Sequence, residues 1–525
     1  MRFFPYILSV LAAGLFLYLA LYVSPWNYIG VAFFGACALL GTYDLIQTNH
    51  SLLRNYPLLA RLRFVAEKLR PEIMQYFIER DTEGRPYDRN HRSVVYQRSK
   101  NVLDDKPFGT QLDVYKEEYE WFSHSIAPKP KSTESFRVTI GGSECKQPYS
   151  ASVLNVSAMS FGALSANAIM AINRGAKLGG FYHDTGEGGC SKYHRKEGGD
   201  LVWEIGSGYF GCRNEDGTFN EDMFRETAQI DNIKMVEIKV SQGAKAGHGG
   251  ILPGPKVSAE IAESRGVPEG VDCVSPAFHT AFSTPKGLLE FLAKLRDLSG
   301  GKPAGFKLCI GRPDEFMGIC KAMIETEIYP DFIVIDGGEG GTGAGPIEFV
   351  DHMGSPLIDG LIFAQNVLVG CGVRDKIKIG AAGKITSAFQ MGRVLALGAD
   401  WCNAARAFMF SVGCIQAMRC QTNSCPVGVA TQDKRRQRGL VVTDKGQRVF
   451  NYHRNTIDDL AQVVAACGLE HPSELSPSML CHRTSTLHHK TYKHLFDWLA
   501  PNELINGSKN EWFAHLWDKA SADRF

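Results

Sequence analysis

The most constraining feature of this 525-residue sequence is a regular alternation that runs from about residue 153 to residue 404. Short β-branched or apolar runs end in glycine-rich turns, and most are followed by an amphipathic stretch long enough for a helix. The candidate strands are Val153–Ala158, Gly180–Thr185, Met235–Val240, Asp272–Ser275, Gly305–Cys309, Phe332–Ile335, Lys376–Ile379 and Trp401–Ala404. Strands that alternate with helices pair in parallel through right-handed crossovers. Eight of them predict an α/β fold, namely a (β/α)8 TIM barrel with insertions.

A doubly wound open sheet is the alternative fold. Such a sheet usually carries G-x-G-x-x-G after its first strand, and residues 155–162 (NVSAMSFG) do not match that turn. Beyond the strands, the segment Tyr452 to Cys467 predicts a helix of the kind that packs against the outside of a barrel.

Charge and cysteine usage exclude some classes of protein. The formal net charge is +1, with basic and acidic residues interspersed, so nothing indicates a nucleic-acid-binding surface. Most of the 14 cysteines are scattered singly through a long sequence. This usage favours a reducing compartment and metal ligation over a disulfide framework.

The first fifty residues form two apolar runs. Residues 3–23 are uncharged, Ser24-Pro25-Trp26-Asn27 interrupts them, and residues 28–43 are apolar again. The first run is about the twenty residues that cross a bilayer, and five arginines and lysines follow the second within residues 54–70. The positive-inside rule then predicts a transmembrane hairpin in the inner (cytoplasmic) membrane, in contact with membrane lipid, with the catalytic domain facing the cytoplasm. A buried core hairpin is the alternative.

These patterns predict four regions. Residues 1–47 are the transmembrane hairpin, residues 48–147 a linker or approach segment, residues 148–475 the barrel, and residues 476–525 a helical tail. A cysteine-rich segment lies at residues 413–432, inside the third region.

Three cysteines in that segment, Cys414, Cys420 and Cys425, are the strongest chemical signal, and Pro426 follows the last of them. Closely spaced thiolates followed by proline are typical ligands of iron–sulfur clusters. Structural zinc usually has four ligands, often in Cys-x2-Cys pairs, whereas only three cysteines lie here and neither spacing is two. The pattern therefore favours an iron–sulfur cluster. Three buried apolar thiols are the alternative.

Glycine-rich turns follow four of the predicted strands. They are Thr185–Gly189, Ser241–Gly250, Asp336–Ala344 and Ala381–Lys384. In barrel enzymes the chemistry lies at the C-terminal ends of strands, and the last turns commonly bind phosphate through backbone N–H groups. Four such turns on one rim predict a phosphorylated cofactor, although glycine also serves ordinary tight turns.

Two lysines, Lys239 and Lys307, lie inside otherwise apolar strands. A buried lysine is costly unless it is paired. Beside the N1–C2 edge of a flavin, such a lysine would stabilise the anionic reduced ring. The alternative is pairing with a carboxylate such as Glu187, Glu237 or Asp336, which would not exclude the flavin role.

Five segments together resemble the FMN-binding synthase domain of glutamate synthase over roughly residues 148–475. They are residues 157–165, 185–189, 241–245, 340–344 and 413–432. The resemblance implies an FMN-binding barrel with a [3Fe-4S] cluster held by Cys414, Cys420 and Cys425. Reduced FMN would pass a hydride to 2-iminoglutarate, formed from 2-oxoglutarate and ammonia, to give L-glutamate. Electrons would arrive through the cluster from ferredoxin or from an NADPH-oxidising reductase subunit.

The resemblance also assigns site residues. It implies that Ala158, Met159 and Ser160 line the flavin, that Glu187 lies at its edge, that Lys239, Gln242 and Lys245 surround the ring and the substrate, and that Gly340, Gly341, Gly383 and Lys384 flank the phosphate. Lys307 is also a candidate for binding the cofactor, because it lies inside an otherwise apolar strand. Lys245 is the first candidate for binding a substrate carboxylate, and an ordinary surface lysine is its alternative.

The sequence departs from the family pattern on the acceptor side of the flavin. His248 stands where the family has glutamate, Ala246 replaces a proline, and residues 264–266 and 278–280 also differ. A second hypothesis is therefore an FMN and iron–sulfur oxidoreductase that acts on another amino or hydroxy acid and exchanges electrons with a membrane carrier. A third is a scaffold with a decayed cofactor site. The chain begins with the apolar hairpin, so we expect it not to hydrolyse glutamine itself.

Overall fold

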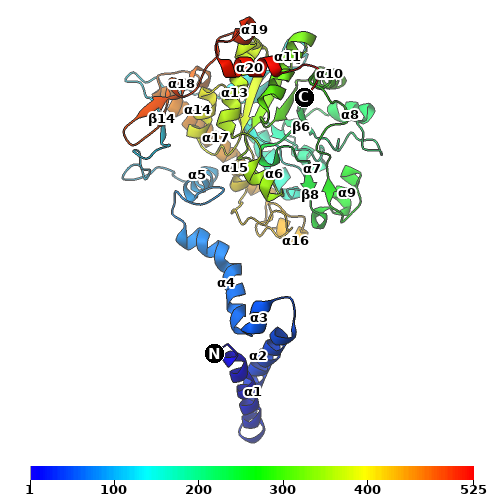
Figure 1. Ribbon diagram of the computed structural model, residues 1–525, viewed down its shortest axis with the longest axis vertical. Helices are drawn as coiled ribbons and strands as arrows, with labels where there is room; N and C mark the ends of the chain where they lie inside the picture. Colours follow the sequence, from blue (N-terminus) through cyan, green and yellow to red (C-terminus); the bar gives the residue numbers. More distant parts are fainter. Residues whose placement is uncertain (1) are drawn as a thin grey trace. The chain divides into compact units, whose positions relative to one another are not determined.

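The computed structural model describes residues 2–525, which divide into two compact units, residues 2–90 and residues 91–525. The first unit is entirely helical. It contains α1 (Phe4–Tyr22), η1 (Pro25–Asn27), α2 (Tyr28–Ile46), α3 (Ser51–Asn55), α4 (Leu59–Ile73) and the π-helical η2 (Met74–Ile78). Helices α1 and α2 pack against each other as a hairpin (Figure 1).

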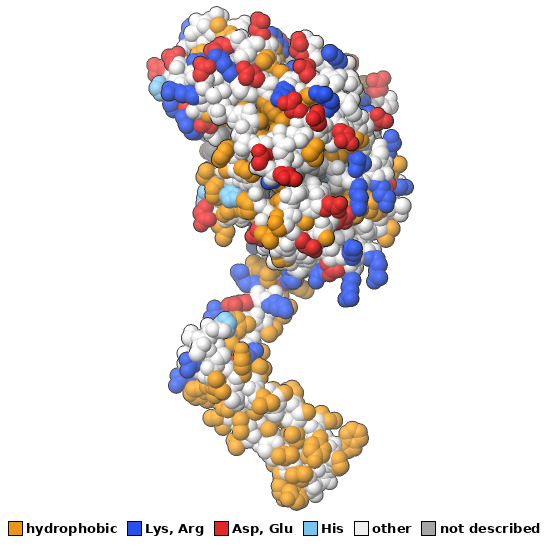
Figure 2. Space-filling model, turned by 90° about the vertical axis from the view of Figure 1, so that its right-hand side faces the viewer, with side chains coloured by type: hydrophobic (Ala, Val, Ile, Leu, Met, Phe, Trp, Pro, Cys, Tyr) orange, Lys and Arg blue, Asp and Glu red, His pale blue; other side chains and the backbone are white. Residues whose placement is uncertain are grey.

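Both hairpin helices are long and apolar enough to cross a membrane, over Phe4–Tyr22 and Pro25–Ile46. Figure 2 shows hydrophobic side chains covering the surface of this hairpin, whereas the surface of the second unit carries interspersed acidic and basic groups. Asp44, near the end of α2, is fully buried and pairs with Arg61 Nη2 at 2.5 Å. The same carboxylate accepts the Leu58 N–H at 3.1 Å, which ties the end of the hairpin to the start of α4.

The second unit is built on a closed barrel of eight parallel strands, and the last strand pairs with the first. In order they are β4 (Leu154–Val156), β5 (His183–Asp184), β6 (Leu201–Ile205), β7 (Ile233–Lys239), β10 (Ala304–Leu308), β11 (Phe332–Asp336), β12 (Lys378–Ala382) and β13 (Trp401–Ala404). The predicted TIM barrel is therefore confirmed, and the doubly wound open sheet is excluded.

One predicted barrel strand was wrong. Residues 272–275 contain β9 (Cys273–Val274), which pairs antiparallel with β8 (Ile251–Leu252) outside the barrel. The eighth barrel strand is β6, which the sequence analysis missed. All five of its residues are buried, including Glu204, whose carboxylate made the segment look unlike a strand interior. The strand tolerates that charge because Lys307 of β10 pairs with it inside the barrel.

Helices surround the barrel (Figure 1). They are α5 (Arg89–Lys100), α6 (Ala166–Gly179), α7 (Lys192–Arg195), α8 (Glu221–Ala228), α9 (Ala259–Arg265), α10 (Pro285–Leu298), α11 (Pro313–Thr326), α12 (Ile347–His352), α13 (Leu357–Gly370), α14 (Ala388–Ala396), α15 (Arg406–Ser411), α16 (Lys434–Gln437), α17 (Val442–Ala466), α18 (Tyr492–Leu495), α19 (Glu503–Asn506) and α20 (Glu511–Lys519). Short 3-10 turns are η3 (Gly243–Lys245), η4 (Gly254–Lys256), η5 (Arg374–Lys376) and η6 (Pro472–Glu474).

Helix α6 shows how the sequence sets these bounds. The Ser165 side chain caps its start by accepting the Ala168 N–H, and Gly180 ends it in the left-handed conformation. Its apolar face is buried, and α17 packs along it, so the helix predicted within residues 452–467 does cover the outside of the barrel. Helix α17 begins earlier than predicted, at Val442.

The remaining strands lie outside the barrel. β1 (Glu120–Phe122), β14 (Leu480–Arg483) and β15 (His489–Thr491) form one small sheet, and β2 (Arg137–Ile140) pairs with β3 (Tyr149–Ser152). The pairing of β1 with β14 joins the predicted approach segment to the predicted tail. The domain boundaries at residues 47, 147 and 475 stay predictions.

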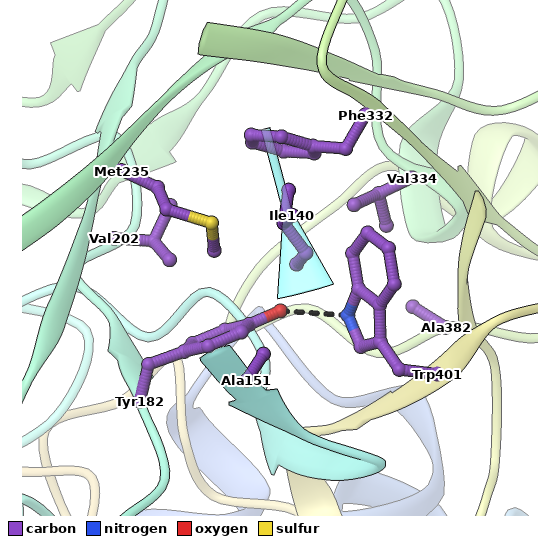
Figure 3. Close-up of a cluster of buried hydrophobic side chains, with 9 residues drawn as sticks. All are labelled: Ile140, Ala151, Tyr182, Val202, Met235, Phe332, Val334, Ala382 and Trp401. Atoms are coloured by element: carbon purple, nitrogen blue, oxygen red, sulfur yellow. Dashed lines mark hydrogen bonds between the residues drawn. The ribbon is translucent and has the colours of Figure 1, made fainter. Parts of the chain in front are cut away.

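The β2–β3 hairpin closes the N-terminal end of the barrel (Figure 3). Ile140 and Ala151 from the hairpin pack into one buried cluster with barrel side chains. Within it, Trp401 donates its Nε1–H to the Tyr182 hydroxyl at 2.8 Å and meets the Phe332 ring edge to face at 6.0 Å. Because this end is filled, the C-terminal ends of the strands are left for chemistry.

Trp401 tests this closure. Replacing Trp401, which is fully buried, with Ala removes the largest side chain of the cluster and leaves the Tyr182 hydroxyl without its donor. We expect a loss of about 3–5 kcal/mol of stability, measured as a lower thermal unfolding temperature of the full chain. Leu487→Ala, at a position 84% exposed, is the control and should change it little. An equal shift in both variants would contradict the packing described.

Candidate active site

The turns after β4 and β5 carry the predicted flavin-lining residues and lie against each other. The Met159 N–H donates to the Asp184 carbonyl at 3.2 Å, and His194 Nε2 lies 3.1 Å from the Met159 carbonyl oxygen. Met159 is buried, whereas Ala158 and Ser160 are half-buried at the C-terminal end of the barrel. These three positions therefore lie on the rim where the sequence placed them.

Glu187 and Lys239 form an ion pair on that rim, with Oε2 2.9 Å from Nζ. Burial alone would raise the pKa of Glu187, but Lys239, Lys245 and Arg265 together outweigh it and hold that pKa at about 2. A Cβ on Gly250 would lie only 2.2 Å from the Glu187 carboxylate, so a larger residue there would displace this side chain. The pairing predicted as an alternative for Lys239 is confirmed.

Lys245 is buried and not a surface lysine. Its Nζ donates to the Ala344 carbonyl at 3.2 Å, which joins the turn after β7 to the turn after β11. The Gly243 N–H also donates to the Asp336 carboxylate at 2.8 Å, and a Cβ on Gly243 would lie 1.7 Å from a backbone oxygen of the facing turn. Burial lowers the pKa of Lys245 to about 8, and Glu187 opposes this shift.

Gln242 lies at the start of the same turn as Lys245, and it is half-buried. Its carbonyl accepts the Lys245 N–H at 3.4 Å. Glu187 after β5 and Lys239 at the end of β7 thus lie together on the rim, with Gln242 and Lys245 in the turn that follows Lys239. The roles that the resemblance implies for these four residues stay predictions.

The predicted phosphate-binding turns follow β11 and β12. Gly340 and Gly341 lie in the first, and Gly383 and Lys384 directly follow β12. Sequence reasoning missed Arg406 here. Its guanidinium lies against Gly341 and donates to the Glu339 carbonyl at 2.7 Å. A basic side chain among backbone amides at the last turns of a barrel is a typical phosphate-binding arrangement.

Lys307, predicted beside the flavin, points into a buried carboxylate cluster in the barrel. Its Nζ pairs with Glu204, lies 3.2 Å from Glu237 Oε1 and lies 3.9 Å from Asp184 Oδ2. Burial would lower the pKa of Lys307, but these carboxylates outweigh it and raise that pKa well above its usual range. The three carboxylates are spaced closely enough to hold a metal ion. The Lys307 ammonium supplies the positive charge there instead. The alternative prediction of carboxylate pairing is confirmed for Lys307.

The three cysteines follow α15 in a loop with unusual backbone. Gln416, Met418 and Asn423 all have positive φ, between 51° and 58°, which non-glycine residues rarely adopt. Such strain is tolerated only where the surrounding structure fixes the loop. Here it brings the thiols within electrostatic range of one another, since Cys420 and Cys425 both add to the effect of burial that raises the pKa of Cys414 to about 12.

The three thiols have the chemistry that an iron–sulfur cluster needs. In such a cluster each cysteine sulfur binds a different iron atom. All three thiols are unpaired with other cysteines, as such ligation needs.

The cysteine loop is attached directly to the rim. The Gln432 side-chain amide donates to the carbonyls of Gly162 and Leu164 at 3.0 and 2.9 Å. Both acceptors belong to the turn after β4, which also carries Met159 and Ser160. The candidate cluster ligands and the candidate flavin-binding residues therefore form one continuous site.

The barrel, its glycine-rich rim and the attached cysteine loop define a class of barrel oxidoreductase. The family described as the conserved region in glutamate synthase matches residues 118–470. The glutamate synthase large subunit-like protein YerD of Bacillus subtilis is 37% identical over 481 residues, covering 84% of this chain and 91% of its own length. The chain belongs to the glutamate synthase family, and it is an oxidoreductase.

Other relatives match a smaller part of this chain or are less similar in sequence. The archaeal glutamate synthase (NADPH) of Methanocaldococcus jannaschii is 33% identical over 314 residues, which cover 59% of this chain and 58% of that protein. The chain thus spans little more than half of the archaeal enzyme. The recombinant flavin-binding domain of baker's yeast flavocytochrome b2 is 13% identical, with a TM-score of 0.43 over 80% of this chain and 84% of that one.

The cysteine assignment leads to a direct prediction. Cys420→Ser removes one soft sulfur ligand, so we expect the purified protein to lose its iron while its thermal unfolding temperature stays close to that of the unmodified chain. Cys145→Ser, a thiol outside the loop, is the matched control and should keep its iron. Unchanged iron content in Cys420→Ser would refute the assignment of this ligand.

Proposed function

We propose that this protein is a membrane-tethered oxidoreductase that binds FMN and a [3Fe-4S] cluster and reduces 2-iminoglutarate, formed from 2-oxoglutarate and ammonia, to L-glutamate. The observation that carries the proposal is the pair of hydrogen bonds from Gln432 to the turn after β4. They hold a three-cysteine loop against the turn predicted to line a flavin, which is the arrangement that electron transfer between the two groups requires.

The residues present fit FMN. The glycine turns after β11 and β12, with Lys384 and Arg406, supply backbone N–H groups and positive charge for its phosphate. Met159 and Ser160 supply the turn beside the ring, and Lys239 supplies a cation at its edge. When bound, FMN supplies hydride transfer and the cluster supplies single electrons. Cys414, Cys420 and Cys425 would hold the cluster.

The substrate side is assigned from charge. Lys239, Lys245 and Arg265 all act on the single negative charge of Glu187, so this part of the rim has an excess of positive charge. This excess favours an anionic acid over a neutral amine. Lys245 would bind a substrate carboxylate, with Gln242 beside it, and Glu187 would hold Lys239 in place. Buried cations bind carboxylates strongly because little water screens them.

The electron donor proposed is ferredoxin or a separate reductase subunit. The hairpin of α1 and α2 would anchor the enzyme in the cytoplasmic membrane, in contact with lipid, with the barrel on the cytoplasmic side. Two helices of sufficient length and an apolar outer surface support this part of the proposal.

The reaction is tested by adding 2-oxoglutarate and ammonium to the anaerobically reduced full chain. Reoxidation of the flavin absorbance together with formation of glutamate is the expected result. Reoxidation only by a different oxo or imino acid, with formation of the corresponding hydroxy or amino acid, would replace 2-iminoglutarate by a substrate of the second hypothesis. Protein isolated without flavin or iron would contradict the enzyme proposal and favour a scaffold.

Lys245 makes binding depend on pH. Below a pKa of about 8 its amine is charged and can bind a carboxylate, and above that pH it is neutral. We expect the dissociation constant of 2-oxoglutarate, measured by titrating the flavin absorbance, to rise as the pH increases through about 8. Lys245→Arg stays charged over this range and should lose that dependence. A pH dependence unchanged in Lys245→Arg would show that another group is responsible.

Arginines in α1 test the membrane anchor. Leu11 and Leu15 are 67% and 57% exposed on the hairpin surface. Replacing both with Arg adds about 2.5–3.5 kcal/mol each to membrane insertion, so the chain should leave the membrane fraction after a carbonate wash. Leu487→Arg, on the second unit, should have no effect. Retention of the double variant in the membrane fraction would contradict the proposed anchor.

A further inference from the structure

A buried lysine outside the proposed substrate site lies between the two cofactor-binding segments. Lys256, the last residue of η4, is only 2% exposed. Its Nζ donates to the Ala163 carbonyl at 2.5 Å and to the Cys420 carbonyl at 3.3 Å. Ala163 belongs to the turn after β4, three residues beyond Ser160, and Cys420 is a candidate iron ligand. The ammonium therefore bridges the flavin-side turn and the cysteine loop.

A second contact joins the same segment to the loop. The Asn423 side-chain amide donates to the Pro255 carbonyl at 3.0 Å, so the residue before Lys256 is also attached to the cysteine loop. Asn423 has a positive φ and lies between Cys420 and Cys425. The segment that carries Lys256 is therefore fixed relative to all of the loop that would bind iron.

The charge of Lys256 has no carboxylate partner. Within residues 2–525, no acidic side chain forms an ion pair with it. Burying an ammonium is costly unless a negative charge is close, and two carbonyl dipoles compensate it only in part. Lys239 and Lys307 differ from it, because Lys239 pairs with Glu187 and Lys307 with Glu204. The contact that Lys256 makes here is instead to a candidate iron ligand, because its Nζ donates to the Cys420 carbonyl.

We infer that Lys256 is a positioning residue for the iron–sulfur centre: its ammonium charge balances the negative charge of the thiolate-bound cluster, and its hydrogen bonds hold the cysteine loop on the flavin-side turn. The inference rests on the proposed function. The reduced form of a cluster carries one more negative charge than the oxidised form. A nearby cation stabilises the reduced form more, so Lys256 raises the reduction potential of the cluster.

The chain contains a matched control for a purely structural role. Lys302 is 7% exposed, and its Nζ donates to the Ala228 and Ile230 carbonyls at 2.6 and 3.3 Å. It is thus also a buried lysine on two backbone oxygens, without an acidic ion-pair partner among the described residues. It precedes β10 at the N-terminal end of the barrel, whereas the cysteine loop contacts the C-terminal rim.

The experiment is a redox titration of the full chain, purified anaerobically, with the cluster followed by electron paramagnetic resonance. We expect Lys256→Met to lower the midpoint potential of the cluster and to slow electron transfer between flavin and iron, with flavin content unchanged. Lys256→Arg should restore the potential toward that of the unmodified chain. Lys302→Met should leave the potential unchanged. A Lys256→Met cluster with an unshifted potential would overturn the inference.

If Lys256→Met loses its iron, its midpoint potential cannot be measured, and the iron content of further variants tests the inference. Lys256→Gln then tests charge separately from hydrogen bonding, because glutamine keeps a donor without a charge. Iron lost from both neutral variants and kept in Lys256→Arg supports the inference, and iron lost equally from all three variants overturns it. An unmodified chain without iron contradicts the proposed function itself, so the two failures are distinguishable.

Discussion

The hydrogen bonds from the Gln432 amide to the carbonyls of Gly162 and Leu164 are the contact on which the rest of the site depends. They join a loop with a strained backbone to the first rim turn of a rigid barrel. Lys256 and Asn423 add further hydrogen bonds between the cysteine loop and the same end of the barrel. The three cysteines and the turn after β4 therefore share one scaffold, which fixes the positive-φ residues Gln416, Met418 and Asn423.

The buried lysines of this barrel have different charged partners at different depths. Deep in the barrel, Lys307 is surrounded by Asp184, Glu204 and Glu237, so a surplus of carboxylates keeps it protonated and fixed. On the rim the balance reverses, since Lys239, Lys245 and Arg265 all act on one glutamate, Glu187. At the cysteine loop, Lys256 has two carbonyl partners, and the cluster proposed above would supply the negative charge.

The sequence predicted the barrel and most of its rim, because strand-to-turn transitions and glycine runs are local features. It misplaced one strand, because Glu204 in β6 and Lys307 in β10 compensate each other across the barrel and neither partner reveals this alone. The same limit explains Arg406 and Lys256. Their importance comes from what lies beside them in space, Gly341 and Cys420 respectively, which are far away in sequence.

The central claim is that one site on this chain holds both a flavin and iron. It is tested most directly by measuring FMN and iron together in the full-length protein after gentle anaerobic purification. The account predicts one FMN and three iron atoms per chain, as a [3Fe-4S] cluster requires. Well-folded protein that contains flavin without iron, or neither, would contradict it.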